Sequence, residues 1–217
     1  MALFRRAVEQ VETIQPAASR FETVQPGILT RHCFSAGSHY DADNVAFGPL
    51  VGLDEHLVEP GAGFASHAHR GVEILSWVLD GELRHEDDSG RVELVGPGAV
   101  LHQSTGSGVR HSEINASSTE PLRFVQLTVL GGSEAPRCVL AEQPRIVAGG
   151  GLFAVLTGRT ELELSSAFLY ATRGSFAITG NPLRPGDSAK LSGSTTITGE
   201  GELLAWTAPG SGPAAAA

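Results

Sequence analysis

Short runs of apolar and β-branched residues recur along the chain, and closely spaced turn signals such as Pro97-Gly98 and Gly131-Gly132 separate them. The 27 glycines and 12 prolines among 217 residues favour many turns over long helices. The pattern predicts strands at Val51–Val58, Val72–Leu79, Glu82–Glu86, Arg91–Val95, Val100–Gln103, Leu122–Leu130, Leu152–Thr157, Ala167–Ala171, Ser175–Thr179, Ser188–Leu191 and Leu203–Thr207. Only Phe4–Val11 has a helical pattern. Many short strands at this spacing predict an all-β sandwich or barrel.

A weak internal repeat suggests that the chain contains two such barrels. The segment Trp77–Val100 aligns with Tyr170–Leu191, so that Gly81 matches Gly174. Each copy has an apolar strand, a glycine turn, a return strand and a Pro-Gly corner, although β hairpins can also resemble each other by chance. We therefore expect two similar barrels in tandem.

All eight histidines lie in the first half of the chain, at or before position 111. In the second copy, Thr160 and Leu162 stand roughly where His67 and His69 stand in the first. Any histidine chemistry is therefore expected in the first barrel.

Two pairs of potential metal ligands show the spacing of residues on one face of a strand. His67 and His69 are two positions apart, and so are His111 and Glu113. Side chains at i and i+2 of a strand point to the same side. A lone pair of this kind fits a surface or core position equally well, but two pairs on neighbouring strands would supply three imidazoles and a carboxylate. That set suits a divalent ion of iron, manganese, nickel, copper or zinc and leaves coordination positions open.

The composition argues against several other classes of protein. A net charge of -9 opposes direct binding to nucleic acid. The chain has neither the apolar run of a signal peptide nor that of a membrane span, so we expect a cytoplasmic protein without a membrane partner. Cys33 and Cys138 cannot form a disulfide framework and are expected as buried thiols, with a single bridge as the alternative.

The histidine pairs also carry a family resemblance. Gly61, His67 and His69 have the spacing of the first cupin motif. The segments HAHRGVEILSWVLDGELRHEDDSG and GPGAVLHQSTGSGVRHSE resemble the pirin family, and within it the shorter pirin-like proteins linked to quercetin 2,3-dioxygenase activity. The resemblance implies an all-β bicupin fold of two tandem jelly-roll β-barrels. It also implies a metal, usually iron, in the first barrel on the residues matching His67, His69, His111 and Glu113.

On this basis we predict four parts of the chain. They are an N-terminal segment (1–30), a metal-binding cupin barrel (31–135), a degenerate cupin barrel without metal ligands (136–210) and a flexible tail (211–217).

The resemblance also implies an activity. We expect a metal-dependent dioxygenase that acts on a flavonol- or catechol-like aromatic such as quercetin, with dioxygen as the second substrate and Fe(II) as the metal. Glu113 is the candidate base for the hydroxyl proton. The alternative is a regulatory module, non-catalytic or redox-responsive, that acts through a protein partner.

Several neighbouring residues receive other roles. Glu73 stands one position before the ligand glutamate of the general cupin motif, so we expect it to pair with Arg70 or to support the site. His102 is expected to line the pocket or to donate a hydrogen bond, with a role as a metal ligand as the alternative. His85, beside a hairpin turn, is expected to be solvent-exposed, as are Asp54 and Glu55.

Overall fold

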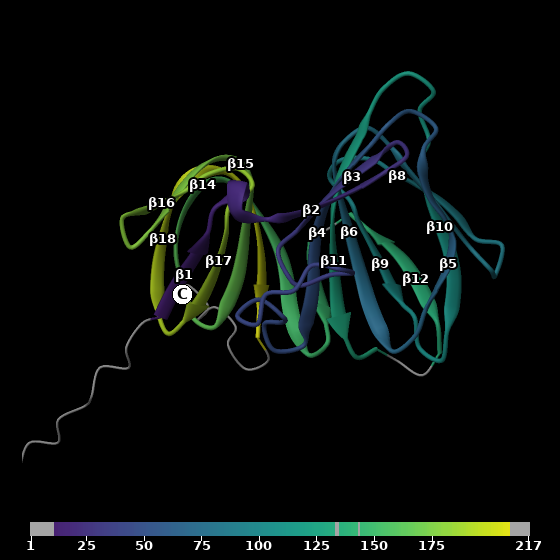
Figure 1. Cartoon of the computed structure of the whole chain (residues 1–217). Coiled ribbons are helices and arrows are strands. Elements are labelled where there is room, and N and C mark those ends of the chain that lie inside the picture. The colour runs from purple at the N-terminus through teal and green to yellow at the C-terminus, as the bar shows by residue number, and fades with distance from the viewer. Residues whose placement is uncertain (1–10, 133–134, 143, 209–217) are drawn as a thin grey trace, which may run out of the picture. The chain divides into compact units, whose positions relative to one another are not determined.

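The computed structural model describes residues 11–132, 135–142 and 144–208 of the chain. Within these ranges the chain forms strands joined by turns, apart from one short 3-10 helix, η1 (Ala17–Ser19). The prediction of an all-β fold is confirmed (Figure 1). The predicted helix lies outside the described residues except for Val11, which begins strand β1 (Val11–Gln15), and the predicted tail lies outside them entirely. Within the described ranges, no helix is long and apolar enough to cross a membrane.

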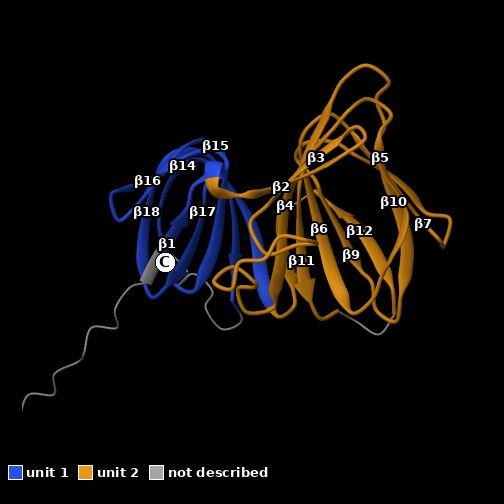
Figure 2. Cartoon of the chain, viewed as in Figure 1, with its two compact units in different colours: residues 1–18, 151–217 blue, residues 19–150 orange. Residues whose placement is uncertain are grey.

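The chain forms two compact units (Figure 2). Unit 2 contains residues 19–150, and unit 1 combines residues 1–18 with residues 151–217. The structure divides the chain after residues 18 and 150, whereas the predicted boundaries follow residues 30 and 135. The reason is strand pairing, since the strands at 21–32 and at 137–141 both join sheets of unit 2.

Unit 2 contains two antiparallel sheets. The four-stranded sheet has the order β5 (Gly63–His69), β10 (Val109–Asn115), β7 (Leu83–Asp87) and β8 (Val92–Val95). The seven-stranded sheet has the order β12 (Arg137–Ala141), β9 (Val100–Ser104), β6 (Val72–Asp80), β11 (Leu122–Leu130), β4 (Leu50–Val58), β3 (Ile28–His32) and β2 (Phe21–Gln25). Strand β13 (Arg145–Ala148) follows near the end of the unit.

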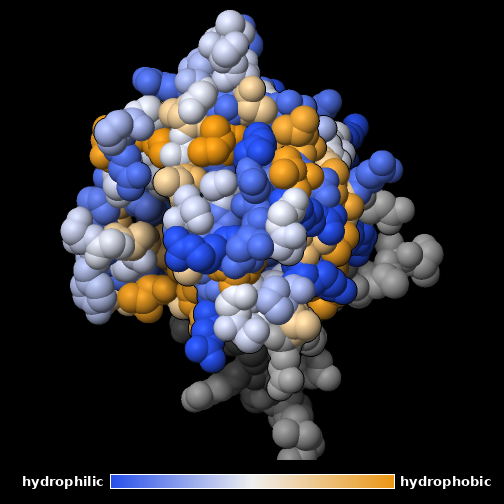
Figure 3. Space-filling model, turned by 90° about the vertical axis from the view of Figure 1, so that its right-hand side faces the viewer, coloured by the Kyte–Doolittle hydropathy of each residue, from blue (hydrophilic) through white to orange (hydrophobic). Residues whose placement is uncertain are grey.

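The inner faces of these sheets enclose the core of the barrel. An apolar cluster that includes Val78, Leu83, Leu101 and Phe124 comes from both sheets. Burial alternates regularly along β7 and β10, and on β8 the outward-facing Val92 and Leu94 are exposed whereas Val95 is buried. Figure 3, which views the molecule from the side that carries this sheet, shows polar and apolar side chains interspersed on the surface. Among the apolar side chains of the barrel interior lie several buried polar ones, including His85, His111 and Glu113.

Unit 1 is a single antiparallel sheet that curls into the second barrel (Figure 1). Its order is β1, β17 (Ser188–Ser192), β15 (Ala167–Ile178), β18 (Thr195–Thr207) and β14 (Gly151–Leu164), and β16 (Asn181–Leu183) pairs with β15. Two predicted strands are thus one continuous strand, β15, whose pairing with β18 shifts register between Ala171 and Arg173. The bicupin prediction is confirmed, and unit 1 contains no histidine.

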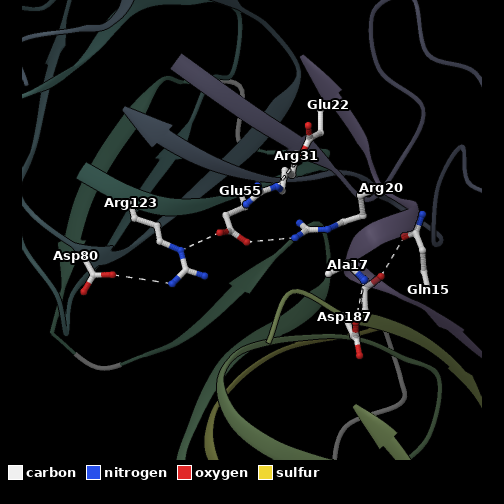
Figure 4. A network of polar contacts seen from close by, with 10 residues as sticks. Gln15, Ala17, Arg20, Glu22, Arg31, Glu55, Asp80, Arg123 and Asp187 are labelled. Carbon is white, nitrogen blue, oxygen red and sulfur yellow. Dashed lines mark hydrogen bonds and ion pairs between the residues drawn. The ribbon is translucent and has the colours of Figure 1, made fainter. Parts of the chain in front are cut away.

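A buried ion-pair network on the outward side of the seven-stranded sheet corrects the expectation for Glu55 (Figure 4). Glu55 is only 5% exposed, and its two oxygens accept hydrogen bonds from Arg123 Nε at 2.8 Å and Arg20 at 3.4 Å. Because strand residues alternate, Glu55 points away from its neighbours Asp54 and His56. Two arginines, rather than water, stabilise its charge.

Candidate metal centre

Strand β5 places His67 and His69 side by side, as their spacing predicts. Their ring centroids are 4.8 Å apart, and both side chains are only partly buried. The register between β5 and β10 shifts at the site. His111 pairs with His67, but Glu113, two residues later, pairs with Phe64, three residues before His67. A bulge of this kind turns side chains locally. The two imidazoles therefore lie at the partly open edge of the barrel interior.

Strand β10 contributes His111, which is almost fully buried and pairs directly with His67. The ligand nitrogens of His67, His69 and His111 all lie within 4.8 Å of one another. His111 Nε2 is 3.0 Å from His67 Nε2. Two adjacent nitrogens bound about 2.1 Å from one octahedral ion would also be roughly 3.0 Å apart. The separation of these two nitrogens thus fits a shared ion.

The hydrogen bonds of the three imidazoles also fit a metal ion. His67 Nδ1 lies 2.8 Å from the Ala65 carbonyl oxygen, so the hydrogen on Nδ1 is donated there and the lone pair stays on Nε2. His69 Nε2 and His111 Nδ1 are buried and have no hydrogen-bond partner in the protein. A buried nitrogen without a partner is costly, and an ion bound between the ε nitrogens would satisfy His69 Nε2, although not His111 Nδ1 on the other side of its ring.

The environment also keeps the imidazoles of His69 and His111 neutral, as ligation requires. Burial, followed by the proximity of His67, His85 and His69, lowers the pKa of His111 to about 3. Burial and the nearby His67 likewise lower the pKa of His69. Both rings therefore carry a free lone pair at neutral pH.

Glu113, the fourth predicted ligand, lies against His111 but faces the opposite sheet. Its oxygens accept hydrogen bonds from Gln126 Nε2 at 2.9 and 3.1 Å and from the Ser76 hydroxyl at 3.4 Å. It lies in a group of possible ligands with His111 and His85, rather than with His67 and His69. Burial raises the pKa of Glu113, and its two hydrogen-bond donors act in the opposite direction.

His85 corrects a prediction, since its side chain is 1% exposed rather than solvent-exposed. It faces the barrel interior because it pairs across the strands with the inward-facing Glu113, and its ring centroid is 5.0 Å from that of His111. The sequence contained a signal for this position, because His85 and Asp87 have the same i, i+2 spacing as the other pairs.

Glu73 and His102 lie on the other face of the seven-stranded sheet from Ser76. They form a partly buried pair, with His102 Nε2 2.9 Å from Glu73 Oε2. Glu73 therefore pairs with His102 rather than Arg70. The strand register places Leu101, not His102, beside Ser76 on the inner face. Neither residue belongs to the three-histidine group.

Replacing Gln126 with leucine should test how far Glu113 depends on it. The variant leaves a buried carboxylate without its shortest hydrogen bonds, so we expect the free energy of unfolding to fall by about 2 kcal/mol. Metal affinity should fall by roughly 10- to 100-fold, as is typical when a partner that orients a ligand is lost. Denaturant unfolding and metal titration measure the two effects. Ser76→Ala, which removes only the 3.4 Å contact, should have a smaller effect on both; a larger one would contradict this account.

A further buried histidine on the inner face predicts a dependence of stability on pH. Burial lowers the pKa of His56 to about 4, and its Nδ1 lies 2.9 Å from the Thr30 hydroxyl. Between pH values of about 6.5 and 4, the unfolded chain binds a proton that the folded chain rejects, so stability falls as the pH falls. His56→Gln should remove up to about 3 kcal/mol of this loss. Denaturant unfolding from pH 7 to pH 4 measures it, and an unchanged slope would contradict it.

The fold and the site together define a class: two-barrel β proteins with a histidine-rich candidate metal centre in one barrel. The sequence profile of the pirin family, "Pirin", matches residues 14–129, which is more than half of the chain. A Mycobacterium tuberculosis protein named "Putative quercetin 2,3-dioxygenase" is 35% identical over 203 residues, which cover 88% of this chain and 82% of that protein. The chain belongs to the pirin family.

Two further comparisons concern a relative in sequence and a solved structure. The quercetin 2,3-dioxygenase of Escherichia coli K12 is 39% identical over 99 residues, which cover 46% of this chain and 43% of that protein. The crystal structure of the bacterial pirin YhhW from Escherichia coli, in complex with nickel(II), is similar with a TM-score of 0.82 and 23% identity. That match covers 92% of this chain and 99% of the other, and it extends the likeness in fold over both barrels.

Proposed function

We propose that this pirin is a metal-dependent oxidoreductase of the quercetin 2,3-dioxygenase type, with Fe(II) on His67, His69, His111 and Glu113. The observation that carries the proposal is the grouping of three imidazoles whose ligand nitrogens lie within 4.8 Å of one another, with the buried His69 Nε2 lacking a partner in the protein. The names of the relatives support the activity, and the nickel(II) complex of a pirin with a similar fold supports a divalent ion.

The exposed and the buried residues of the site have different roles in the proposed reaction. His67 and His69 are partly open to solvent, so an aromatic substrate reaches the site from their side. When bound, the metal supplies Lewis acidity that lowers the pKa of a coordinated hydroxyl group. Glu113 accepts the hydroxyl proton on a carboxylate oxygen, and Gln126 orients that carboxylate. A flavonol or a catechol, with adjacent oxygens on an electron-rich ring, fits this chemistry.

Oxygen consumption tests the proposal. The Fe(II)-loaded protein, incubated aerobically with quercetin, should consume dioxygen and release a ring-cleaved product. Glu113→Gln should lower the rate at least tenfold. Glu86→Gln is the matched control, because Glu86 points outward from β7 and pairs with Arg84, and it should leave the rate unchanged. Absence of oxygen uptake by a protein that retains its metal would overturn the dioxygenase assignment and favour the regulatory alternative.

A further inference from the structure

A second group of possible metal ligands lies deeper in the same barrel and has no part in the proposed reaction. The ligand atoms of His85, Asp87 and Cys138 lie within 4.8 Å of one another. His85 and Asp87 are on the inner side of β7, and Cys138 is on β12, the edge strand of the opposite sheet. The group thus joins the two sheets on the far side of His111 from His67 and His69.

The local structure fixes the carboxylate and the thiol in place. Asp87 Oδ1 accepts hydrogen bonds from the backbone nitrogens of Ser89 at 3.0 Å and Arg91 at 3.3 Å, and from the Ser89 hydroxyl at 2.5 Å, so the turn after β7 orients this side chain. Cys138 is buried, forms no disulfide and pairs across the strands with Gln103. Both groups are therefore held without a metal.

Two buried polar groups beside them lack partners, which is the independent sign of a ligand. Both ring nitrogens of His85 are buried and make no hydrogen bond. The side-chain oxygen of Gln103 is also buried and accepts no hydrogen bond. Asp87, Gln103 and Cys138 also line a cavity of about 290 Å³. Leaving such groups buried and unsatisfied destabilises the fold. A cation would satisfy the acceptor nitrogen of His85 and the oxygen of Gln103.

We propose that His85, Asp87 and Cys138 form a second metal site, selective for a thiophilic divalent ion such as Zn²⁺. One imidazole, one carboxylate and one thiolate are all ligands of four-coordinate zinc, and the Gln103 oxygen or a water completes the shell. Ligands of one zinc ion are roughly 3–4 Å apart, so closure on the ion requires movements of about 1 Å. Binding releases the thiol proton of Cys138.

Cobalt is a suitable probe, because a Co²⁺–thiolate bond gives a charge-transfer absorption band in the near ultraviolet. Titration of the full chain with Co²⁺ should produce this band, and Zn²⁺ should abolish it by displacement. Cys138→Ser should not give the band. Cys33→Ser is the matched control, since Cys33 is the other buried free cysteine, and it should retain the band. Asp87→Asn should weaken Co²⁺ binding at this site about tenfold.

The test separates this site from the proposed active centre. A His67→Gln, His69→Gln double variant should lose metal at the first centre and keep the cobalt–thiolate band. Absence of the band in the wild-type chain, or a band that persists in Cys138→Ser, would overturn the proposal. Circular dichroism checks that each variant folds. If Cys138→Ser does not fold, the weaker Co²⁺ binding expected of Asp87→Asn tests the site independently.

Discussion

Replacing His111 with glutamine should abolish the stabilisation that a divalent metal gives to this protein. His111 is the one histidine whose ligand atoms group both with His67 and His69 and with Glu113. A metal ion present at a hundredfold excess over its Kd should raise the free energy of unfolding of the wild-type chain by about 2.7 kcal/mol. The His111→Gln variant should gain almost none of this, because loss of a central ligand lowers affinity far more than loss of an orienting partner.

The measurement compares unfolding curves of each protein with and without the ion, and the metal content of the protein as isolated. His39→Gln is the control histidine variant. His39 stacks on Phe21 and its Nε2 lies 3.0 Å from the Glu22 carbonyl oxygen, outside the three-histidine group. It should keep the full stabilisation. Equal stabilisation of His111→Gln and the wild-type chain would exclude His111 as a ligand.

Replacing Gly174 with alanine should strongly destabilise unit 1. Gly174 has a φ of +83°, and a Cβ there would lie 2.1 Å from the Glu200 carbonyl oxygen and 2.6 Å from the Gly201 Cα. Because both contacts are with backbone, the strands β15 and β18 must separate to admit the methyl group. We expect a loss of at least about 3 kcal/mol from this overpacking and the strained φ together.

Gly158→Ala separates the two causes. Gly158 also has a positive φ, +77°, but a Cβ there would meet nothing within 4 Å. This variant should lose only the conformational part, about 1 kcal/mol. Thermal unfolding of both variants measures the difference. Similar losses for the two variants would show that close strand contact is not what requires glycine at position 174.

The alternation of strands made much of the fold and part of the site predictable. His67, His69 and His111 were predictable as a group because a strand repeats every two residues, and the strands that carry them are neighbours. The long strands were harder to predict. Gly174 resembled a turn in the sequence, but it lies within the continuous strand β15. The hairpin β2–β3, with its Pro26-Gly27 turn, carried a signal that we missed.

The polar interior was least predictable, because alternation does not say which face of a strand is buried. Glu55 lies in an Asp-Glu-His run that resembles a solvated surface, yet it is buried against two arginines that are distant in sequence. His85 was assigned to a hairpin surface for the same reason. Gln126, the only amide side chain in an otherwise largely apolar strand, was a detectable signal, but its partner Glu113 becomes known only once the sheets are packed.

The pairing of β1 with β17 has a consequence for the order in which the protein folds during synthesis. Strand β1 belongs to unit 1 and precedes unit 2 in the sequence, but its partner strand β17 is nearly 180 residues later. Unit 2 is contiguous, so it can form as soon as residue 150 has left the ribosome. The N-terminal strand must wait, unpaired, until the rest of its sheet is translated. Unpaired strand edges invite aggregation, so completion of unit 1 is the vulnerable step of biogenesis.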